Sequence, residues 1–396
     1  MKNHLYEKLD ILYDEMIHIR RYLHQHPELS YKEVKTPAYI ADYHRSLGHE
    51  VRTEVGGRGV VATLRGEKPG KTIALRADFD ALPIHEETDA PYKSTVDGVM
   101  HACGHDGHTA TLLVLAKVLN SMKGELQGDV VFIHQHAEEV YPGGAIEMIA
   151  DGCLKGVDVI FGTHLWSSFP YGTIEYRSGT IMAASASFEI EILGKGGHGA
   201  QPHLTRDALV IGAQLVTTLQ QIVSRRVNPI DSVVVTVGNF VAKNAPNVIA
   251  DKAILNGTVR TLDVKIHDSI EQEMKRIVQG TCIAAGVDYR FEYNRGYPPV
   301  VNHHEETMFL AQVAETVPGV DAVNEMEISM GGEDFGYYLQ HVKGTFFFTG
   351  AENPEWSVTY PHHHPKFDID ERAMLIAAKT LGGALLEYHK KIEGDL

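Results

Sequence analysis

Short apolar segments that end in polar residues are the strongest constraint on the fold of this chain. Residues 130–137 and 157–163 are nearly continuous apolar runs, and they are followed by Glu138-Glu139 and by His164. A short helical pattern at residues 143–150 lies between them. This strand–helix–strand alternation predicts an α/β domain whose mainly parallel sheet is flanked by helices.

Charged and polar residues gather where these predicted strands end. The segments 60–64 and 72–75 read as two earlier buried strands, and the second runs into Asp78 and Asp80. In open α/β sheets, ligands bind beyond the carboxyl ends of the strands. We therefore expect Asp78, Asp80, Glu138, Glu139 and His164 to lie near one edge of the sheet.

The stretch from residue 100 to 111 contains the residues most typical of metal ligands. Cys103 and His105 are separated by Gly104, and an apolar helical pattern follows at once. A thiolate and an imidazole suit zinc and related transition metals better than calcium or magnesium. The alternative is a buried core cysteine beside solvent-exposed histidines. The other motifs of the chain favour the metal site.

A single ion would not need all the potential ligands in this sequence. Cys103, His105, Glu139, His164 and one histidine of the run 362–364 make a set larger than a closed or an open zinc site uses. Two metal ions that share a bridging group would use them all. One of the adjacent acids Glu138 and Glu139 can then bind metal while the other accepts a proton from water. Without a metal, this pair would be a solvent-exposed acidic turn.

The middle of the chain has a different pattern of elements. Residues 187–193 alternate like a half-exposed strand, and they are followed by a helix (207–223), two strands (232–241 and 253–262), a helix (269–285) and a strand (288–293). The order β-α-β-β-α-β is that of a ferredoxin-like α+β unit. A chain of 396 residues is also too long for one compact core. We therefore predict a catalytic domain of residues 1–182 and 297–396, with a lid or dimerisation domain of residues 183–296 inserted into it.

Charge and hydropathy exclude several classes of partner. The formal net charge is −16, and no cluster of lysines and arginines is present, which disfavours nucleic acid and anionic membranes as partners. The cysteines Cys103, Cys153 and Cys282 are odd in number and widely spaced, so no disulfide framework is predicted. No apolar run approaches the roughly 18 residues of a membrane span. We expect a cytoplasmic protein.

These motifs resemble the aminoacylase and glutamate-carboxypeptidase family of dinuclear metallohydrolases. The likeness is greatest to its branch of hippurate hydrolases and indoleacetyl-amino-acid hydrolases, and it extends over nearly the whole chain. The motifs begin at Leu23 (LHQHPELS), Arg76 (RADFDALP), Met100 (MHACGHDGH), His136 (HAEE), Gly194 (GKGGHGAQPH), Gly257 (GTVR), Gly331 (GGEDF) and His363 (HHPKFD).

The resemblance implies a role for each site residue. The metal ligands would be Cys103, His105, Glu139, His164 and His363, with Cys103 bridging two ions. Glu138 would be the general base and acid, and Asp80 the carboxylate that orients the site. His198 would reach the substrate carbonyl from the partner subunit of a homodimer, and Asn247 and Arg260 would contact the carboxylate end of the substrate. Asp78 stands where the wider family has a ligand histidine, so it is a doubtful ligand, and His362 and His364 remain alternatives to His363.

The reaction implied by the resemblance is the hydrolysis of N-acyl-L-amino acids, such as N-acetyl or hippurate-like conjugates, to a carboxylic acid and a free amino acid. The cofactors would be two divalent ions of zinc, manganese, nickel or cobalt per chain. Three alternatives remain: a metallo-dipeptidase or carboxypeptidase, an N-acetyl-diaminopimelate deacetylase, and a metal-binding module without catalysis. The adjacent acids Glu138 and Glu139 argue against the last of these.

Overall fold

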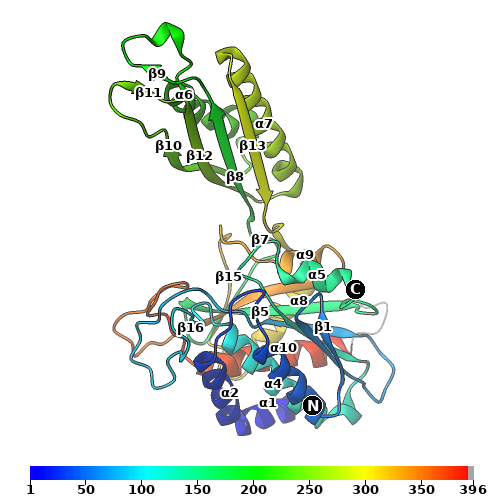
Figure 1. Cartoon of the computed structure of the whole chain (residues 1–396). Helices are drawn as coiled ribbons and strands as arrows, with labels where there is room; N and C mark the ends of the chain where they lie inside the picture. Colours follow the sequence, from blue (N-terminus) through cyan, green and yellow to red (C-terminus); the bar gives the residue numbers. More distant parts are fainter. Residues whose placement is uncertain (391–396) are drawn as a thin grey trace. The chain divides into compact units, whose positions relative to one another are not determined.

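The computed structural model describes residues 1–390, which form two compact units (Figure 1). The larger unit contains residues 1–181, 300–327 and the segment from residue 334 onward. The smaller unit contains residues 182–299 and 328–333. Within residues 1–390, no helix is both long and apolar enough to cross a membrane.

The larger unit is built on a mixed sheet of eight strands. Their spatial order is β1 (Glu50–Val55), β2 (Gly59–Leu64), β4 (Val130–Gln135), β3 (Ile73–Asp78), β5 (Val159–Pro170), β16 (Lys343–Glu352), β6 (Thr173–Tyr176) and β15 (Ala322–Glu325). The four central strands β4, β3, β5 and β16 are parallel, whereas β1 and β2 on one side and β6 on the other join by antiparallel pairing. The predicted α/β class with a mainly parallel sheet is confirmed.

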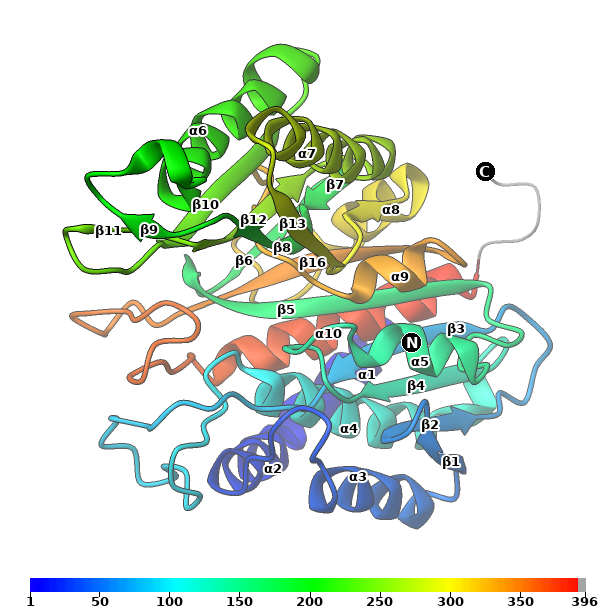
Figure 2. The same ribbon diagram turned by 45° about the horizontal axis from the view of Figure 1, so that its top comes forward.

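Helices cover both faces of this sheet (Figure 2). Leu75, Phe132 and Phe161 point from adjacent strands into one apolar core with Leu115 and Leu385. That core is formed with the helices α1 (Lys2–Ile11), α2 (Tyr13–Gln25), α3 (Lys35–Ser46), α4 (His105–Asn120), α8 (His304–Ala314) and α10 (Arg372–Tyr388). The short helices α5 (Gly144–Ala150) and α9 (Phe335–Leu339) lie on the opposite face. The strands β7 (Gly179–Met182) and β14 (Val300–Asn302) pair with each other.

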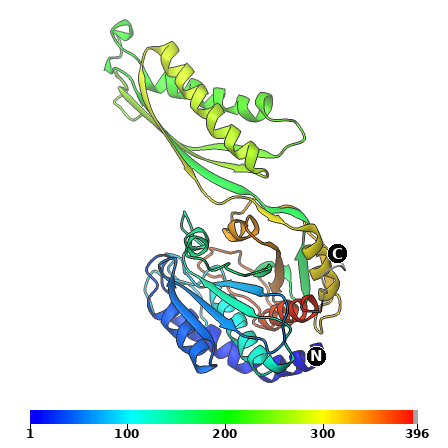
Figure 3. The ribbon, with the colours of Figure 1, turned by 90° about the vertical axis from the view of Figure 1, so that its right-hand side faces the viewer.

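The smaller unit has the predicted β-α-β-β-α-β order. Its elements are β8 (Ala184–Leu193), β9 (Gly197–His198), α6 (Ala208–Gln221), β10 (Val233–Val241), β11 (Val248–Ile249), β12 (Lys252–Thr261), α7 (Val264–Ala285) and β13 (Asp288–Arg295). The sheet order is β10-β12-β8-β13, and every neighbouring pair is antiparallel. Both helices pack on one face through a core that includes Ile190, Leu215 and Met274 (Figure 3).

The structure divides the chain at slightly different positions from those predicted. Residues 328–333 were expected in the catalytic domain, but they cluster with the smaller unit. Ser329 forms a β-bridge with Met182, and the Nε of Arg260 donates to the carbonyl of Met330 at 3.2 Å. These are contacts between residues far apart in the chain, which local sequence patterns do not reveal.

Candidate metal centre

The loop before α4 brings the cysteine and the first histidine of the candidate site together. Gly104 has φ +85°, a left-handed conformation that disfavours any residue with a Cβ atom. This turn places Cys103 just before α4 and His105 as the first residue of that helix. Both side chains are buried.

One group of potential ligands consists of Cys103, His105 and Glu139. Their ligand atoms all lie within 4.8 Å of one another. The Nε2 of His105 is 3.9 Å from the Oε1 of Glu139, and this nitrogen is buried without a hydrogen-bond partner among the described residues. Buried polar atoms are normally paired, so an unpartnered Nε2 that faces a carboxylate oxygen is what a metal ion between them would satisfy.

A second group shares the same cysteine. It consists of Cys103, His164 and His362, and its ligand atoms also lie within 4.8 Å of one another. The Nδ1 of His164 is 2.8 Å from the carbonyl oxygen of Leu165, to which it donates, so its Nε2 faces the Sγ of Cys103 at 3.5 Å. Cys103 is therefore the one residue common to both groups.

The three late histidines lie in different surroundings. The Nε2 of His363 is 3.2 Å from the Oε1 of Glu139, and the backbone of His363 is left-handed at φ +66°. His362 is half-buried, donates from Nε2 to the carbonyl of Leu165 at 3.1 Å and stacks on Trp166. The Nδ1 of His364 accepts from the N–H of Lys366. The geometry thus places His363 and His362, but not His364, beside the other ligands.

Asp80 contacts two of the potential metal ligands, His105 and Glu139. Its Oδ1 lies 3.1 Å from the Nδ1 of His105, and its Oδ2 accepts from Ser30 and from the backbone N–H of Glu139. Burial alone would raise the pKa of Asp80, but the hydrogen bonds from His105 and Glu139 hold it below its ordinary value. An ionised Asp80 keeps the proton of His105 on Nδ1, which leaves Nε2 as the ligand atom.

Both carboxylate oxygens of Asp78 accept hydrogen bonds from other side chains of the protein. Its Oδ2 accepts from Arg76 at 2.6 Å, and its Oδ1 accepts from the Nδ1 of His108 at 2.6 Å. The Nε2 of His108 in turn accepts from the N–H of Leu165 at 2.9 Å. Asp78 and His108 also form a group of potential ligands with His105, whose ligand atoms lie within 4.8 Å of one another, but both oxygens of Asp78 already accept hydrogen bonds within the protein.

The site carries a surplus of negative charge. Burial raises the pKa of the Cys103 thiol well above its ordinary value, and the nearby carboxylates of Glu139, Glu138 and Asp78 raise it further. Burial opposes protonation of His105, yet the carboxylates of Asp78, Asp80 and Glu139 raise its pKa to about 10. A divalent cation would neutralise this surplus and stabilise the thiolate, so the donor set fits such a cation.

The remaining candidate residues lie in the smaller unit. His198 is exposed on β9, directly opposite Val248 of β11, and the carbonyl of Asn247 accepts from the N–H of Gly199 at 2.8 Å. His198 and Asn247 are therefore neighbours. Arg260 lies near the other end of the unit, where it pairs with Ser185 on β8.

One supporting residue was not predicted from the sequence. Glu33 is fully buried, and its Oε1 accepts from the N–H of Ala137 at 3.0 Å, immediately before Glu138. In the sequence, it stands in a polar segment that reads as a solvent-exposed loop. Nothing local distinguishes it from an exposed acid, because its burial depends on the distant strand β4.

The chain has relatives among known proteins. A model of Peptidase family M20/M25/M40 matches residues 74–387. YhaA of Bacillus subtilis (strain 168), an amidohydrolase by name, is 57% identical over 390 residues that cover 98% of each chain. The N-acyl-L-amino acid amidohydrolase of Geobacillus stearothermophilus is 47% identical over 77% of this chain and 82% of its own length.

A solved structure has the same fold. The YXEP protein of Bacillus subtilis, described as a dinuclear metal-binding peptidase of the M20 family, superposes with a TM-score of 0.83 and 34% sequence identity. The match covers 97% of this chain and all of that one.

Proposed function

This chain belongs to peptidase family M20/M25/M40 and is a metal-binding amidohydrolase, and we propose that its substrates are N-acyl-L-amino acids. The reaction would release a carboxylic acid and a free amino acid. The acyl group would be acetyl, benzoyl as in hippurate, or a similar conjugate.

The position of Cys103 in both ligand groups is the observation that carries the two-ion site of this proposal, and the 47% identity to an N-acyl-L-amino acid amidohydrolase supports the substrate class. His105 and Glu139 would hold one ion, His164 would hold the other with His363, and Cys103 would bridge them. His362 is the alternative to His363, because it belongs to the second group. Two bound divalent ions polarise a substrate carbonyl and lower the pKa of water to roughly 7.

Glu138 is the residue that we propose moves the proton. It is 6% exposed and directly precedes the ligand Glu139. Its carboxylate would take a proton from the attacking water and then donate that proton to the leaving amide nitrogen. This transfer leaves a neutral amine and a carboxylic acid and regenerates ionised Glu138, and the acid then gives its proton to the amine, so that the products are a carboxylate and an ammonium group.

The distance along β12 supports a substrate site built from two chains. Arg260 would pair its planar guanidinium with the substrate carboxylate. It is separated from Lys252 at the other end of β12 by about 27 Å, at the usual rise per strand residue. His198 and Asn247 lie beyond the Lys252 end, because β9 and β11 follow and precede that end of the sheet. Within one smaller unit, they lie too far from Arg260 to share one small substrate with it.

A homodimer would resolve this separation. One chain would supply Arg260 and the metal ligands, and the partner would supply His198 and Asn247. Consistent with this, β10 is an edge strand of the smaller unit with exposed Val234, Phe240 and Val241, and the adjacent helix α6 exposes Leu209 and Val210. An unpaired apolar edge of this kind favours pairing with a second copy across a two-fold axis.

The experiment that tests the proposal is a hydrolysis panel with metal-reconstituted protein. Separate samples are loaded with zinc, manganese, nickel or cobalt, because affinity alone does not decide which ion is used. The substrates are N-acetyl, N-benzoyl and indoleacetyl amino acids, N-acetyl-diaminopimelate and unblocked dipeptides, with the Glu138→Gln variant as a blank.

The alternatives predict different outcomes. Turnover of unblocked dipeptides alone would indicate a metallo-dipeptidase or carboxypeptidase. Turnover of N-acetyl-diaminopimelate alone would narrow the activity to that deacetylation. A fully metal-loaded chain that hydrolyses none of these compounds would contradict the proposal and favour a module without catalysis.

A further inference from the structure

The turn that carries Glu138 and Glu139 begins at a residue with an unfavourable backbone conformation. Ala137 is fully buried and has φ +51°, in the left-handed region that residues with a Cβ atom rarely adopt. Such a conformation persists only where the surrounding structure enforces it. The groups that contact the backbone of Ala137 therefore decide where the next two side chains point.

Glu33 provides one of these contacts. Its Oε1 accepts from the N–H of Ala137 at 3.0 Å, while the carbonyl of Ala137 accepts from the N–H of Gly144 at 3.2 Å. Two residues later, the N–H of Glu139 donates to the Oδ2 of Asp80 at 3.0 Å. Buried carboxylates thus hold the N–H groups of Ala137 and Glu139, one on each side of Glu138.

The segment that carries Glu33 is itself held in place. Ser30 donates to Asp80 at 2.7 Å, and Leu29 forms a parallel bridge with Ala81. The carboxylate of Glu28 accepts from the N–H groups at the start of α3, including that of Thr36 at 2.8 Å. Glu33 is therefore fixed to the same strand ends that carry the candidate ligands.

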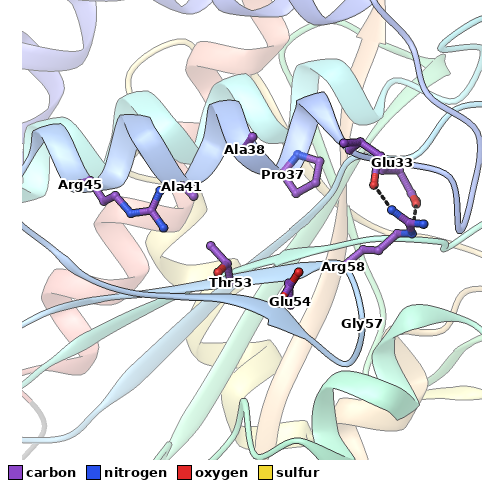
Figure 4. A pocket seen from close by; sticks show the side chains of 10 residues that line it. Glu33, Pro37, Ala38, Ala41, Arg45, Thr53, Glu54, Gly57 and Arg58 are labelled. Atoms are coloured by element: carbon purple, nitrogen blue, oxygen red, sulfur yellow. Dashed lines mark hydrogen bonds and ion pairs between the residues drawn. The ribbon is translucent and has the colours of Figure 1, made fainter.

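Arg58 closes the outer side of Glu33. Its guanidinium donates to the backbone carbonyl of Glu33, and its Nε lies 3.9 Å from Oε2, beside a cavity of about 260 Å³ (Figure 4). The Oε2 atom has no hydrogen-bond partner among the described residues. Burial raises the pKa of Glu33 to about 7, but either protonation state leaves an oxygen that can accept from Ala137. The hydrogen bond between Glu33 and the N–H of Ala137 therefore depends on the length of the Glu33 side chain more than on its charge.

We infer that Glu33 is a positioning residue that fixes the Glu138–Glu139 turn through the backbone of Ala137. This inference rests on the proposed function for its effect on catalysis, but the contact itself can be tested without any substrate. Glu33 does not touch the reacting atoms. Instead, it determines the direction in which the side chain of Glu138 points. Because Glu138 is the proposed proton carrier, even a small displacement of its carboxylate should lower the rate strongly.

The test separates reach from charge with two variants. Glu33→Gln keeps the length and loses the charge, and Glu33→Asp keeps the charge but is one methylene too short. We expect Glu33→Asp to lower kcat by about tenfold to a hundredfold with KM and metal content nearly unchanged, and Glu33→Gln to retain most of kcat. Glu306→Asp is the matched control, because Glu306 is equally buried and contacts Tyr388. It should lower thermal stability and leave kcat unchanged.

Amide hydrogen exchange provides the readout that needs no substrate. The peptide covering residues 130–141 should exchange faster in Glu33→Asp than in the native chain, and Glu33→Gln should resemble the native chain. Unchanged exchange in Glu33→Asp, or equal loss of kcat in both variants or in the Glu306→Asp control, would overturn the inference. If the native chain hydrolyses no acylated amino acid, the proposed function fails while the exchange result still decides the role of Glu33.

Discussion

The Sγ of Cys103 lies 3.5 Å from the Nε2 of His164, and the same sulfur atom belongs to a second ligand group with His105 and Glu139. A thiol buried among carboxylates is costly to ionise, which is why its pKa is raised. One cation on either side of the sulfur would remove that cost. The central position of Cys103 makes it the residue on which the dinuclear proposal can be tested most directly.

Replacement of Cys103 should lower metal content as well as rate. We expect the native chain to bind about two divalent ions, and Cys103→Ala to bind fewer because both ions lose a shared ligand. Elemental analysis after dialysis measures this directly. Cys153→Ala is the control, since Cys153 is also buried in the larger unit but belongs to neither ligand group. Full metal content and full activity in Cys103→Ala would rule out a bridging role.

The two adjacent glutamates should fail in different ways. Glu138→Gln removes the proton acceptor, so we expect it to keep its metal and to lose about 10²–10⁴ in kcat. Glu139→Gln weakens a ligand whose Oε1 faces His105, so it should lose metal first. Metal titration and single-substrate kinetics on the same preparations distinguish the two. Equal loss of metal in both variants would show that the division of roles is wrong.

Complementation between inactive chains tests whether His198 acts on the partner subunit. His198→Ala and Glu138→Gln should each be nearly inactive, the first by about 10²–10³ in rate. In a mixed dimer, one site carries both defects and the other carries neither. Under conditions that let subunits exchange in equal amounts, activity should return to about a quarter of the native value.

The controls for this experiment are each variant mixed with itself and a size measurement that confirms mixed dimers. If mixed dimers form and activity does not return, His198 does not act in trans. A native chain that remains monomeric at all concentrations would contradict the homodimer.

Three buried histidines should make the protein sensitive to acid. The Nδ1 atoms of His44 and His49 are 2.9 Å apart, and so are the Nε2 atoms of His44 and His134. Each contact needs one of its two facing nitrogens to lack a proton. Burial lowers the pKa of His134 to about 3 and that of His49 to about 4, and it also lowers the pKa of His44.

The sign of the pH effect follows from these lowered pKa values. In the unfolded chain, a histidine takes up a proton below about pH 6.5, but these folded histidines do not. The free energy of unfolding should therefore fall as the pH is lowered from about 6.5 towards 4, by about 2 kcal/mol for His134 at pH 5. Urea unfolding at pH 7.5 and 5 should show a smaller loss in His134→Gln than in the native chain. The control is His341→Gln, because His341 is exposed, and this variant should lose as much free energy of unfolding as the native chain does. An unchanged pH dependence in His134→Gln would contradict the prediction.

Most of the regular elements follow from local sequence patterns, because burial on one face requires a fixed spacing of apolar residues. The predicted strand 130–137 corresponds to β4, Val130–Gln135. The helix predicted at 269–285 begins earlier, at Val264, where the side chain of Asp263 accepts from the N–H of Lys265 and so caps it. The short edge strands β1 and β15 were not predicted, since strands with exposed polar residues form only where a neighbouring strand pairs with them. The four-residue strand β6 was also not predicted, because it is too short to give a clear sequence pattern.

By itself, the sequence determined the kinds of ligand and where they stand in the chain. A thiol, imidazoles and carboxylates placed at the ends of apolar strands are local properties, and they indicate a metal site before any contact is known. Only the tertiary structure decided how these groups are used: Asp78 is occupied by Arg76 and His108, while Glu33 is buried against Ala137. In the tertiary structure, Asn247 and Arg260 also lie near opposite ends of strand β12. Such outcomes depend on contacts between residues distant in the chain, which no local pattern encodes.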